Sequence, residues 1–173
     1  MKNQTILSPA VIEEIKHYRE LAEILESDTY QSMNQFRHHG RTTCYDHCLA
    51  VACATFIVSR RCRMDFISAT RGALLHDLYL YDWHTDSKGF HGFRHPFISL
   101  QNAEGLFSLN DIERDAIIKH MWPLTPIPPK YPESFLVSMA DKIATLSEYC
   151  NKLYAVKQSL WAFSSQVRNR SEQ

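Results

Sequence analysis

The sequence predicts an all-α fold, a bundle of helices, on two observations. In several segments apolar residues recur every three or four positions, which is the period of a helix with one buried face. No segment of useful length alternates apolar and polar residues as a half-buried strand does, and we find no internal repeat. The 173 residues suit a single domain, 1–173, whose motif-bearing core spans about 42–148.

Three helices are predicted in the first half of the chain, each after a residue that suits a helix cap. Ser8 is followed by a proline at the first helical position, and a helix is expected over about 9–27. Thr43 precedes the apolar stretch LAVACATFIV, in a helix that reaches about Arg60. Asp65 precedes a third helix, which ends in a His-Asp dipeptide.

The segment 79–94 is predicted to be a loop, because it is aromatic, contains two glycines and has no clean period. Pro96 is expected to open a fourth helix directly after this loop. Asn110 or Ser108 is expected to cap a fifth helix.

A proline-rich stretch, 123–132, separates the fifth helix from the last one. It cannot be helical, because proline lacks a backbone donor and restricts the residue before it. The last long helix is expected from about Glu133, and the polar tail after about 163 is expected to fray.

Composition excludes several classes of function. Lys plus Arg and Asp plus Glu both number 19, and this net charge of zero favours neither a nucleic acid polymer nor an anionic membrane as a partner. The N-terminus lacks the apolar segment of a signal peptide, and the longest apolar stretch is too short to span a bilayer. We therefore expect a cytoplasmic protein without a membrane partner; the oligomeric state is not predicted.

The five cysteines form an odd set in a chain without export signals. Cys44, Cys48 and Cys53 are expected to be reduced core residues of one helix. The alternative is a zinc site that combines Cys44 and Cys48 with His47, but this set lacks a convincing fourth ligand.

The candidate functional residues are imidazoles and carboxylates placed at the edge or centre of apolar runs. They are His47, the pair His76 and Asp77, His120, and Asp141. An ionised group taken out of water without a partner costs on the order of several kcal/mol, so such a group must be neutral, paired or bound to a cation. If the helices pack in one bundle, a divalent metal ion is the simplest way to hold these groups together.

The order of these residues resembles a known family. His47, then His76 with Asp77, then Asp141 resembles the H…HD…D pattern of the HD-domain metal-dependent phosphohydrolases. The segments TTCYDHCLAVA, GALLHDLYLYD and VSMADKIATL are similar to the segments that flank that pattern. The resemblance implies an HD-domain-like helical bundle and a small standalone phosphohydrolase, acting on phosphate monoesters or diesters, nucleotides included.

Two further histidines fall where two-metal members of that family place extra ligands, His95 in FRHPF and His120 in IIKHMWPLTP. The resemblance therefore implies a binuclear centre in which Asp77 bridges two ions. The implied ligands of the first ion are His47, His76, Asp77 and Asp141, and those of the second are Asp77, His95 and His120. The alternatives are a helix-capping role for His95 and a helix-dipole partner in His120.

Imidazole and carboxylate ligands suit Mn, Fe, Co, Ni or Zn better than Ca. The implied reaction is attack on phosphorus by a metal-activated hydroxide, with Asp77 and Lys142 as catalytic residues. Lys142 and Arg94 are candidates for binding the substrate phosphate, because each adjoins a ligand. The alternative for both is a charged side chain in solvent. Neighbouring residues on a helix point about 100° apart, so a residue next to a ligand need not point towards the site. Leu80 stands where some one-metal members carry a glutamate, which shifts the work of a separate carboxylate base to the metal-bound hydroxide. Asp82 could substitute for that glutamate only if the helix has ended before it.

The remaining histidines receive lesser roles. His91 is considered as an alternative ligand or as an acid near the leaving group. The others are expected at the surface or in ordinary hydrogen bonds: His17, His38, His39 and His84.

Two other functions stay open. The six-ligand arrangement is also similar to that of di-iron oxygenases built on the HD fold, and ligand identity does not separate the two chemistries. A non-catalytic module that senses a nucleotide or a metal would bind its ligand without turnover. For the hydrolase, the expected partner is a small phosphorylated molecule.

Overall fold

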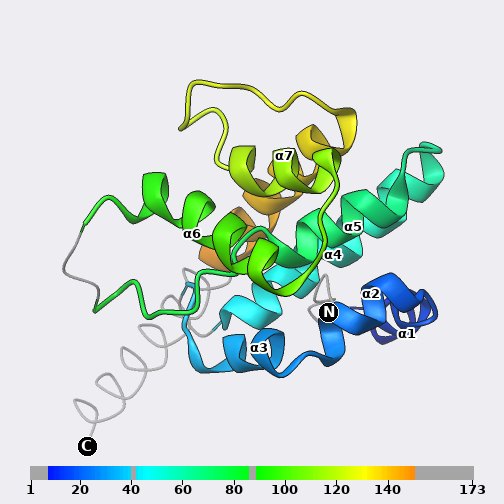
Figure 1. Ribbon diagram of the computed structural model, residues 1–173, viewed down its shortest axis with the longest axis horizontal. Coiled ribbons are helices and arrows are strands. Elements are labelled where there is room, and N and C mark those ends of the chain that lie inside the picture. Colours follow the sequence, from blue (N-terminus) through cyan, green and yellow to red (C-terminus); the bar gives the residue numbers. More distant parts are fainter. Residues whose placement is uncertain (1–7, 40–41, 86–88, 151–173) are drawn as a thin grey trace, which may run out of the picture.

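The computed structural model describes residues 8–39, 42–85 and 89–150. Every regular element in these ranges is a helix, apart from one isolated bridge between Arg37 and Thr43. The all-α class predicted from the sequence is therefore confirmed (Figure 1). None of the described helices combines the length and the apolar character that crossing a membrane requires.

The helices follow one another with short connections. In chain order they are α1 (Pro9–Lys16), α2 (Arg19–Glu26), α3 (Asp28–Gln31), the 3-10 helix η1 (Ser32–Gln35), α4 (Cys44–Arg61), α5 (Phe66–Leu75), α6 (His91–Leu106) and α7 (Asp111–Lys119), and a last helix over 132–150. In Figure 1, α4 and α5 lie between α1–α3 on one side and α6 and α7 on the other. α5 packs against both α4 and α7, and α7 packs against α6.

The predicted caps begin three of these helices. Thr43 Oγ1 accepts a hydrogen bond from the backbone nitrogen of Asp46 at 3.0 Å, and the Asp65 side chain caps α5 in the same way. Asn110 forms a reciprocal capping box with Glu113 at the start of α7. Ser8 occupies the N-cap position of α1, but its side chain makes no capping hydrogen bond.

The helix predicted over 9–27 is wrong in one respect, because it is two helices. The chain bends between α1 and α2, where Tyr18 has extended backbone angles. The Tyr18 ring packs edge-on against Phe56 and Phe66, with centroids 5.9 and 5.2 Å apart. The partly buried ring thus packs against α4 and α5 at the point where the helix breaks. The short helices α3 and η1 were not predicted.

The start of α6 also differs from the prediction, since the helix begins at His91 and not at Pro96. The loop ends at Phe90, which has left-handed backbone angles (φ 52°). Pro96 lies inside the helix, where its missing N–H costs one backbone hydrogen bond. The Nδ1 of His95 donates to the carbonyl of His91 at 2.9 Å and stabilises this additional turn.

Cys44, Cys48 and Cys53 are buried thiols of α4, as predicted. Among the described residues, no group that could hold a metal ion includes a cysteine. The alternative zinc site with Cys44 and Cys48 is therefore not supported.

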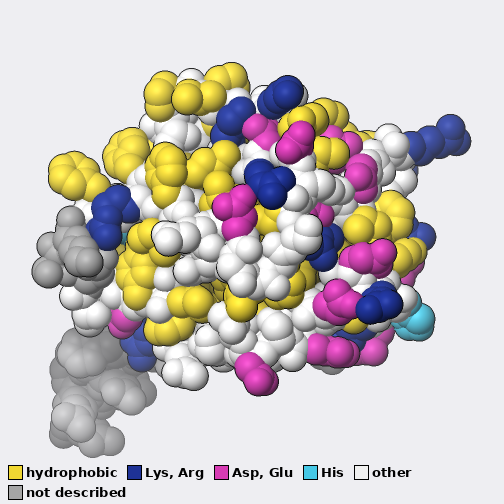
Figure 2. Space-filling model, viewed as in Figure 1, with side chains coloured by type: hydrophobic (Ala, Val, Ile, Leu, Met, Phe, Trp, Pro, Cys, Tyr) yellow, Lys and Arg dark blue, Asp and Glu magenta, His cyan; other side chains and the backbone are white. Residues whose placement is uncertain are grey.

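Apolar side chains gather on the surface over α6 and the segment that follows α7, at the left and top of Figure 2. Phe90, Phe97 and Ile127 are exposed by 80%, 65% and 64%. Acidic side chains are concentrated on the right of the same view, around α1 and α2.

Candidate metal centre

The six predicted ligands come from five helices and meet at one place. His47 lies in the first turn of α4, and Asp141 in the middle of the last helix. His76 and His120 are the C-cap residues of α5 and α7. Asp77 follows His76 directly, and His95 lies in the second turn of α6. All six side chains are buried.

One group of donors surrounds His47. Its Nε2 lies 3.1 Å from Asp141 Oδ1 and 3.3 Å from the Nε2 of His76. The Oδ2 atom of Asp77 is 3.9 Å from His47 Nε2 and 3.7 Å from His76 Nε2. His47, His76 and Asp77 are close enough together to hold a metal ion.

A second group lies on the other side of Asp77. The Nε2 atoms of His95 and His120 are 2.7 Å apart. Asp77 Oδ1 is 3.1 Å from His95 Nε2 and 3.5 Å from His120 Nε2. These three residues also form a group that could hold a metal ion. The two oxygens of one carboxylate thus face two different groups, as a bridging ligand requires.

Hydrogen bonds to the backbone orient three of the imidazoles. The Nδ1 atoms of His76 and His120 each donate to the carbonyl three positions earlier, at 2.7 Å. The Nδ1 of His95 donates to the carbonyl four positions earlier, at 2.9 Å. A carbonyl only accepts, so Nδ1 carries the hydrogen and the neutral ring keeps its lone pair on Nε2. Metal-bound histidines are oriented in this way.

The facing Nε2 atoms would repel one another if both carried only lone pairs. Burial opposes the charged form of His47, but its hydrogen bonds with Asp141 and Glu148 outweigh burial and raise its pKa to about 10. Burial likewise opposes the charged form of His95, yet the charge of Asp77 raises its pKa. Burial lowers the pKa of His76, and it lowers that of His120 to about 3. Each facing pair therefore combines one imidazole that holds a proton readily with one that does not.

The carboxylates keep their charge in this buried place. Burial would raise the pKa of Asp77, but the neighbouring imidazoles His76 and His95 hold it well below its usual range. The pKa of Asp141 is also lowered, chiefly because its hydrogen bond with His47 outweighs burial. Asp77 Oδ1 is buried and faces the Nε2 atoms of His95 at 3.1 Å and His120 at 3.5 Å, but neither contact has the geometry of a hydrogen bond. A buried anionic oxygen in this position, beside two imidazole nitrogens, fits a divalent cation.

A pocket of about 590 Å³ opens onto this cluster. It reaches Asp77, His95, His120 and Asp141, whereas His47 and His76 are fully buried behind them. Large apolar and aromatic side chains line its walls, among them Trp83, Met121, Leu124, Leu146 and Tyr149. The pocket thus combines a polar floor with apolar walls, as many small-molecule sites do.

The two predicted phosphate-binding cations are placed differently. Lys142 lines the pocket, and its Nζ lies 3.7 Å from Asp141 Oδ2. It donates to the carbonyl of His120 at 2.6 Å, and burial lowers its pKa. Arg94 donates to the carbonyl of Gly89 at 3.2 Å and is not among the described residues that line the pocket. Lys142 thus lies at the pocket, whereas the described hydrogen bond of Arg94 is with the loop at Gly89.

His91 lies at the pocket, although it is not part of a described metal-binding group. Its ring stacks on His95 with centroids 4.6 Å apart, and its Nδ1 is 2.9 Å from the hydroxyl of Tyr81. His17 and His84 are exposed, as predicted. His39 is half-buried and lines the pocket.

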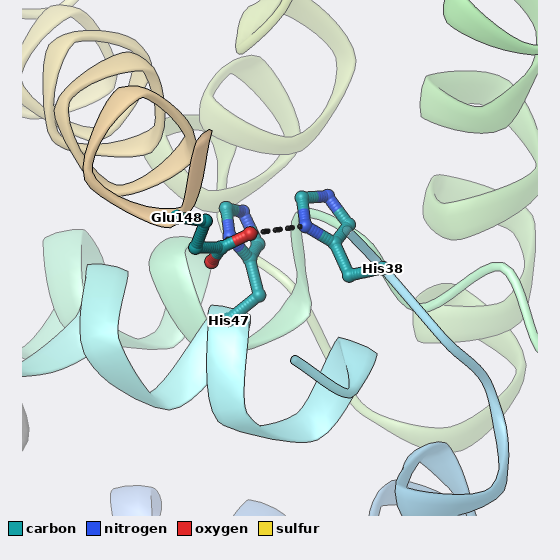
Figure 3. Close-up of side chains that lie close together, drawn as sticks. All are labelled: His38, His47 and Glu148. Atoms are coloured by element: carbon teal, nitrogen blue, oxygen red, sulfur yellow. Dashed lines mark hydrogen bonds and ion pairs between the residues drawn. The ribbon is translucent and has the colours of Figure 1, made fainter. Parts of the chain in front are cut away.

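His38 and Glu148 also lie at the cluster, although neither was predicted from the sequence as a site residue. His38 was expected at the surface or in an ordinary hydrogen bond; it is 7% exposed, it hydrogen-bonds to Glu148, and its Nε2 lies 3.4 Å from Asp77 Oδ2. Figure 3 shows the Glu148 carboxylate beside the rings of His38 and His47, with its hydrogen bond to His38 dashed. Glu148 lies two helical turns after Asp141, and this shared face of the last helix was the available signal. His38 precedes α4 outside any periodic segment and carries no such signal.

Comparisons of this chain with protein-family models, with curated proteins and with solved structures found no match. The candidate site therefore rests on the geometry described above.

Proposed function

We propose that the protein is a binuclear metal-dependent phosphohydrolase of the HD-domain type. The observation that carries the proposal is the position of Asp77. Its two oxygens lie between two buried pairs of imidazoles, with Nε2 distances of 3.7 and 3.9 Å on one side and 3.1 and 3.5 Å on the other. Three of these rings have Nδ1 bound to backbone carbonyls, so that Nε2 is the atom offered to an ion.

The proposed ligands of one ion are His47, His76, Asp77 and Asp141, and those of the other are Asp77, His95 and His120. This mixture of imidazole and carboxylate donors favours Mn, Fe, Co, Ni or Zn. When bound, such ions lower the pKa of water towards neutrality and neutralise charge on phosphoryl oxygens. Thr145 Oγ1 donates to Asp141 Oδ1 at 3.3 Å and helps to orient that carboxylate.

The pocket determines what reaches the cluster. Lys142 stands at its edge, with its ammonium near Asp141 and donating to the His120 carbonyl and to the carbonyl and hydroxyl of Ser138, so a phosphate group would be bound in exchange for one of these hydrogen bonds. Trp83, Leu124 and Leu146 would cover an apolar or aromatic substituent and exclude bulk water from the floor. We therefore favour a phosphate monoester or diester with an apolar group as the substrate.

The proposal is tested by loading the purified chain with Mn, Co or Zn and assaying an aryl phosphate and an aryl phosphodiester. Turnover that depends on metal and is lost in Asp77→Asn, but kept in the exposed-site control His84→Ala, supports it. Oxidation that consumes dioxygen in the iron-loaded protein, without phosphate release, would identify an oxygenase instead. Metal binding without turnover on any phosphate ester would indicate a sensor.

A further inference from the structure

We propose that His38 is a seventh metal ligand of this centre, acting through Nε2 beside Asp77 Oδ2, and that Glu148 holds its ring in place. The inference rests on the metal centre proposed above and adds a donor that its six ligands do not include. His38 precedes α4 on a segment paired with Thr43 by an isolated bridge at Arg37.

Glu148 binds two imidazoles with one carboxylate. Its Oε1 lies 2.8 Å from the Nδ1 of His47, and its Oε2 lies 3.1 Å from the Nδ1 of His38 (Figure 3). Its side chain is 11% exposed, and the two histidines hold one oxygen each. An ionised carboxylate only accepts hydrogen bonds, so both Nδ1 atoms carry hydrogen.

The two rings then lie in nearly the same orientation. His38 stacks on His47 with centroids 3.7 Å apart and planes 23° apart. With both Nδ1 atoms at the same carboxylate, both Nε2 atoms point towards the aspartates. His38 Nε2 is 3.4 Å from Asp77 Oδ2, closer than the 3.9 Å of His47 Nε2. His38 therefore has the same hydrogen bond to Glu148 as His47, and its Nε2 points the same way. Because it also lies closer to the bridging carboxylate, His38 is placed to be a metal ligand itself.

Two other roles fit the same contacts. A His38 ring protonated on both nitrogens would join Glu148 to Asp77 by two hydrogen bonds and would never touch a metal ion. His38, His47 and Glu148 are also close enough together to hold an ion of their own. An ion in that group would be an additional bound Co²⁺, and a His38 that only donates hydrogen bonds would leave the surroundings of the ions unchanged on substitution, so a spectroscopic titration separates these roles from the proposed one.

The experiment is a titration of the metal-free full-length chain with Co²⁺, followed by visible absorption. The wild type, His38→Ala, His38→Gln and His39→Ala are compared, with far-UV circular dichroism to verify folding. His39 is the matched control, because it adjoins His38 and lines the pocket, but its Nδ1 faces the Tyr149 hydroxyl at 3.4 Å.

We expect His38→Ala to lower the affinity for one of the two Co²⁺ ions by more than roughly 100-fold and to change that ion's absorption bands. Loss of a hydrogen-bond partner that does not itself touch the metal lowers metal affinity by about 100-fold at most. His38→Gln, which retains an oxygen donor, should recover part of the affinity with a different spectrum, and His39→Ala should match the wild type. A folded His38→Ala or His38→Gln protein with wild-type bands for both ions would overturn the inference. A wild-type chain that binds no Co²⁺ would overturn it together with the metal centre. Two bound ions without hydrolysis of any phosphate ester would refute only the proposed function.

Discussion

Replacement of the bridging carboxylate, Asp77→Asn, is the perturbation with the largest expected consequence. The amide has the same shape but no charge, and its oxygen can face only one of the two imidazole groups, so its NH₂ must face the other. Loss of an outer hydrogen-bond partner of a ligand lowers metal affinity by roughly 10- to 100-fold. Asp77 lies within 3.9 Å of five Nε2 atoms, so its loss should exceed that range for both ions.

A 100-fold weaker affinity corresponds to about 2.8 kcal/mol per ion. Because bound ligands stabilise the folded state in proportion to the logarithm of their affinity, the gain in unfolding free energy on adding metal should fall by about the same amount. The assay is a metal titration against a competing chelator, together with urea unfolding with and without metal. Asp82→Asn is the matched control, because the Asp82 carboxylate is 42% exposed and accepts a hydrogen bond from the backbone of His84. Retention of both ions at wild-type affinity in Asp77→Asn would refute the bridging role.

Three further outcomes follow from the geometry. His120→Ala should lose the ion on the His95 side and retain the other; unchanged metal content would show that this group is misassigned. The pKa of His47 is raised from 6.5 to about 10, so its protonated ring stabilises the metal-free protein. This contribution to the free energy of unfolding is complete below pH 6.5 and is lost as the pH rises towards 10. Metal must displace this proton near neutral pH, so the affinity for metal should rise with pH. Calorimetry in two buffers of different ionisation enthalpy should detect the released proton, and binding without proton release would contradict the assignment of His47 as a ligand. Gly72→Ala places a Cβ 2.8 Å from Ala116 Cβ, which forces α5 and α7 apart and should lower the free energy of unfolding by roughly 1–3 kcal/mol. Gly105→Ala is the control, because nothing lies within 4 Å of its added Cβ, and urea unfolding should show no loss of free energy for it.

Local signals were sufficient for much of the fold. Thr43, Asp65 and Asn110 cap the helices that they were expected to cap, because a side chain that accepts from a backbone donor two or three positions later acts within one turn. Helix ends that depend on distant packing were not predictable in this way. The break before Tyr18 depends on Phe56 and Phe66, which lie in other helices.

The residues of the candidate site likewise differ in whether local sequence or distant packing reveals them. His47, Asp77 and Asp141 stand out in the sequence because a charged or imidazole group inside an apolar run needs a partner. His38 lies in a polar segment, where a histidine needs no explanation, and its contact with Glu148 joins residues 110 positions apart. Only the packing of the last helix against the start of α4 brings these two residues to the cluster.

The most direct test of the account is the position of metal in the folded protein. Crystals of the chain loaded with Co²⁺ or Zn²⁺, measured at the absorption edge of the metal, should show two anomalous peaks on opposite sides of the Asp77 carboxylate. One should lie among His47, His76 and Asp141, and the other between His95 and His120. Loaded crystals without a peak in this cluster would contradict the central claim.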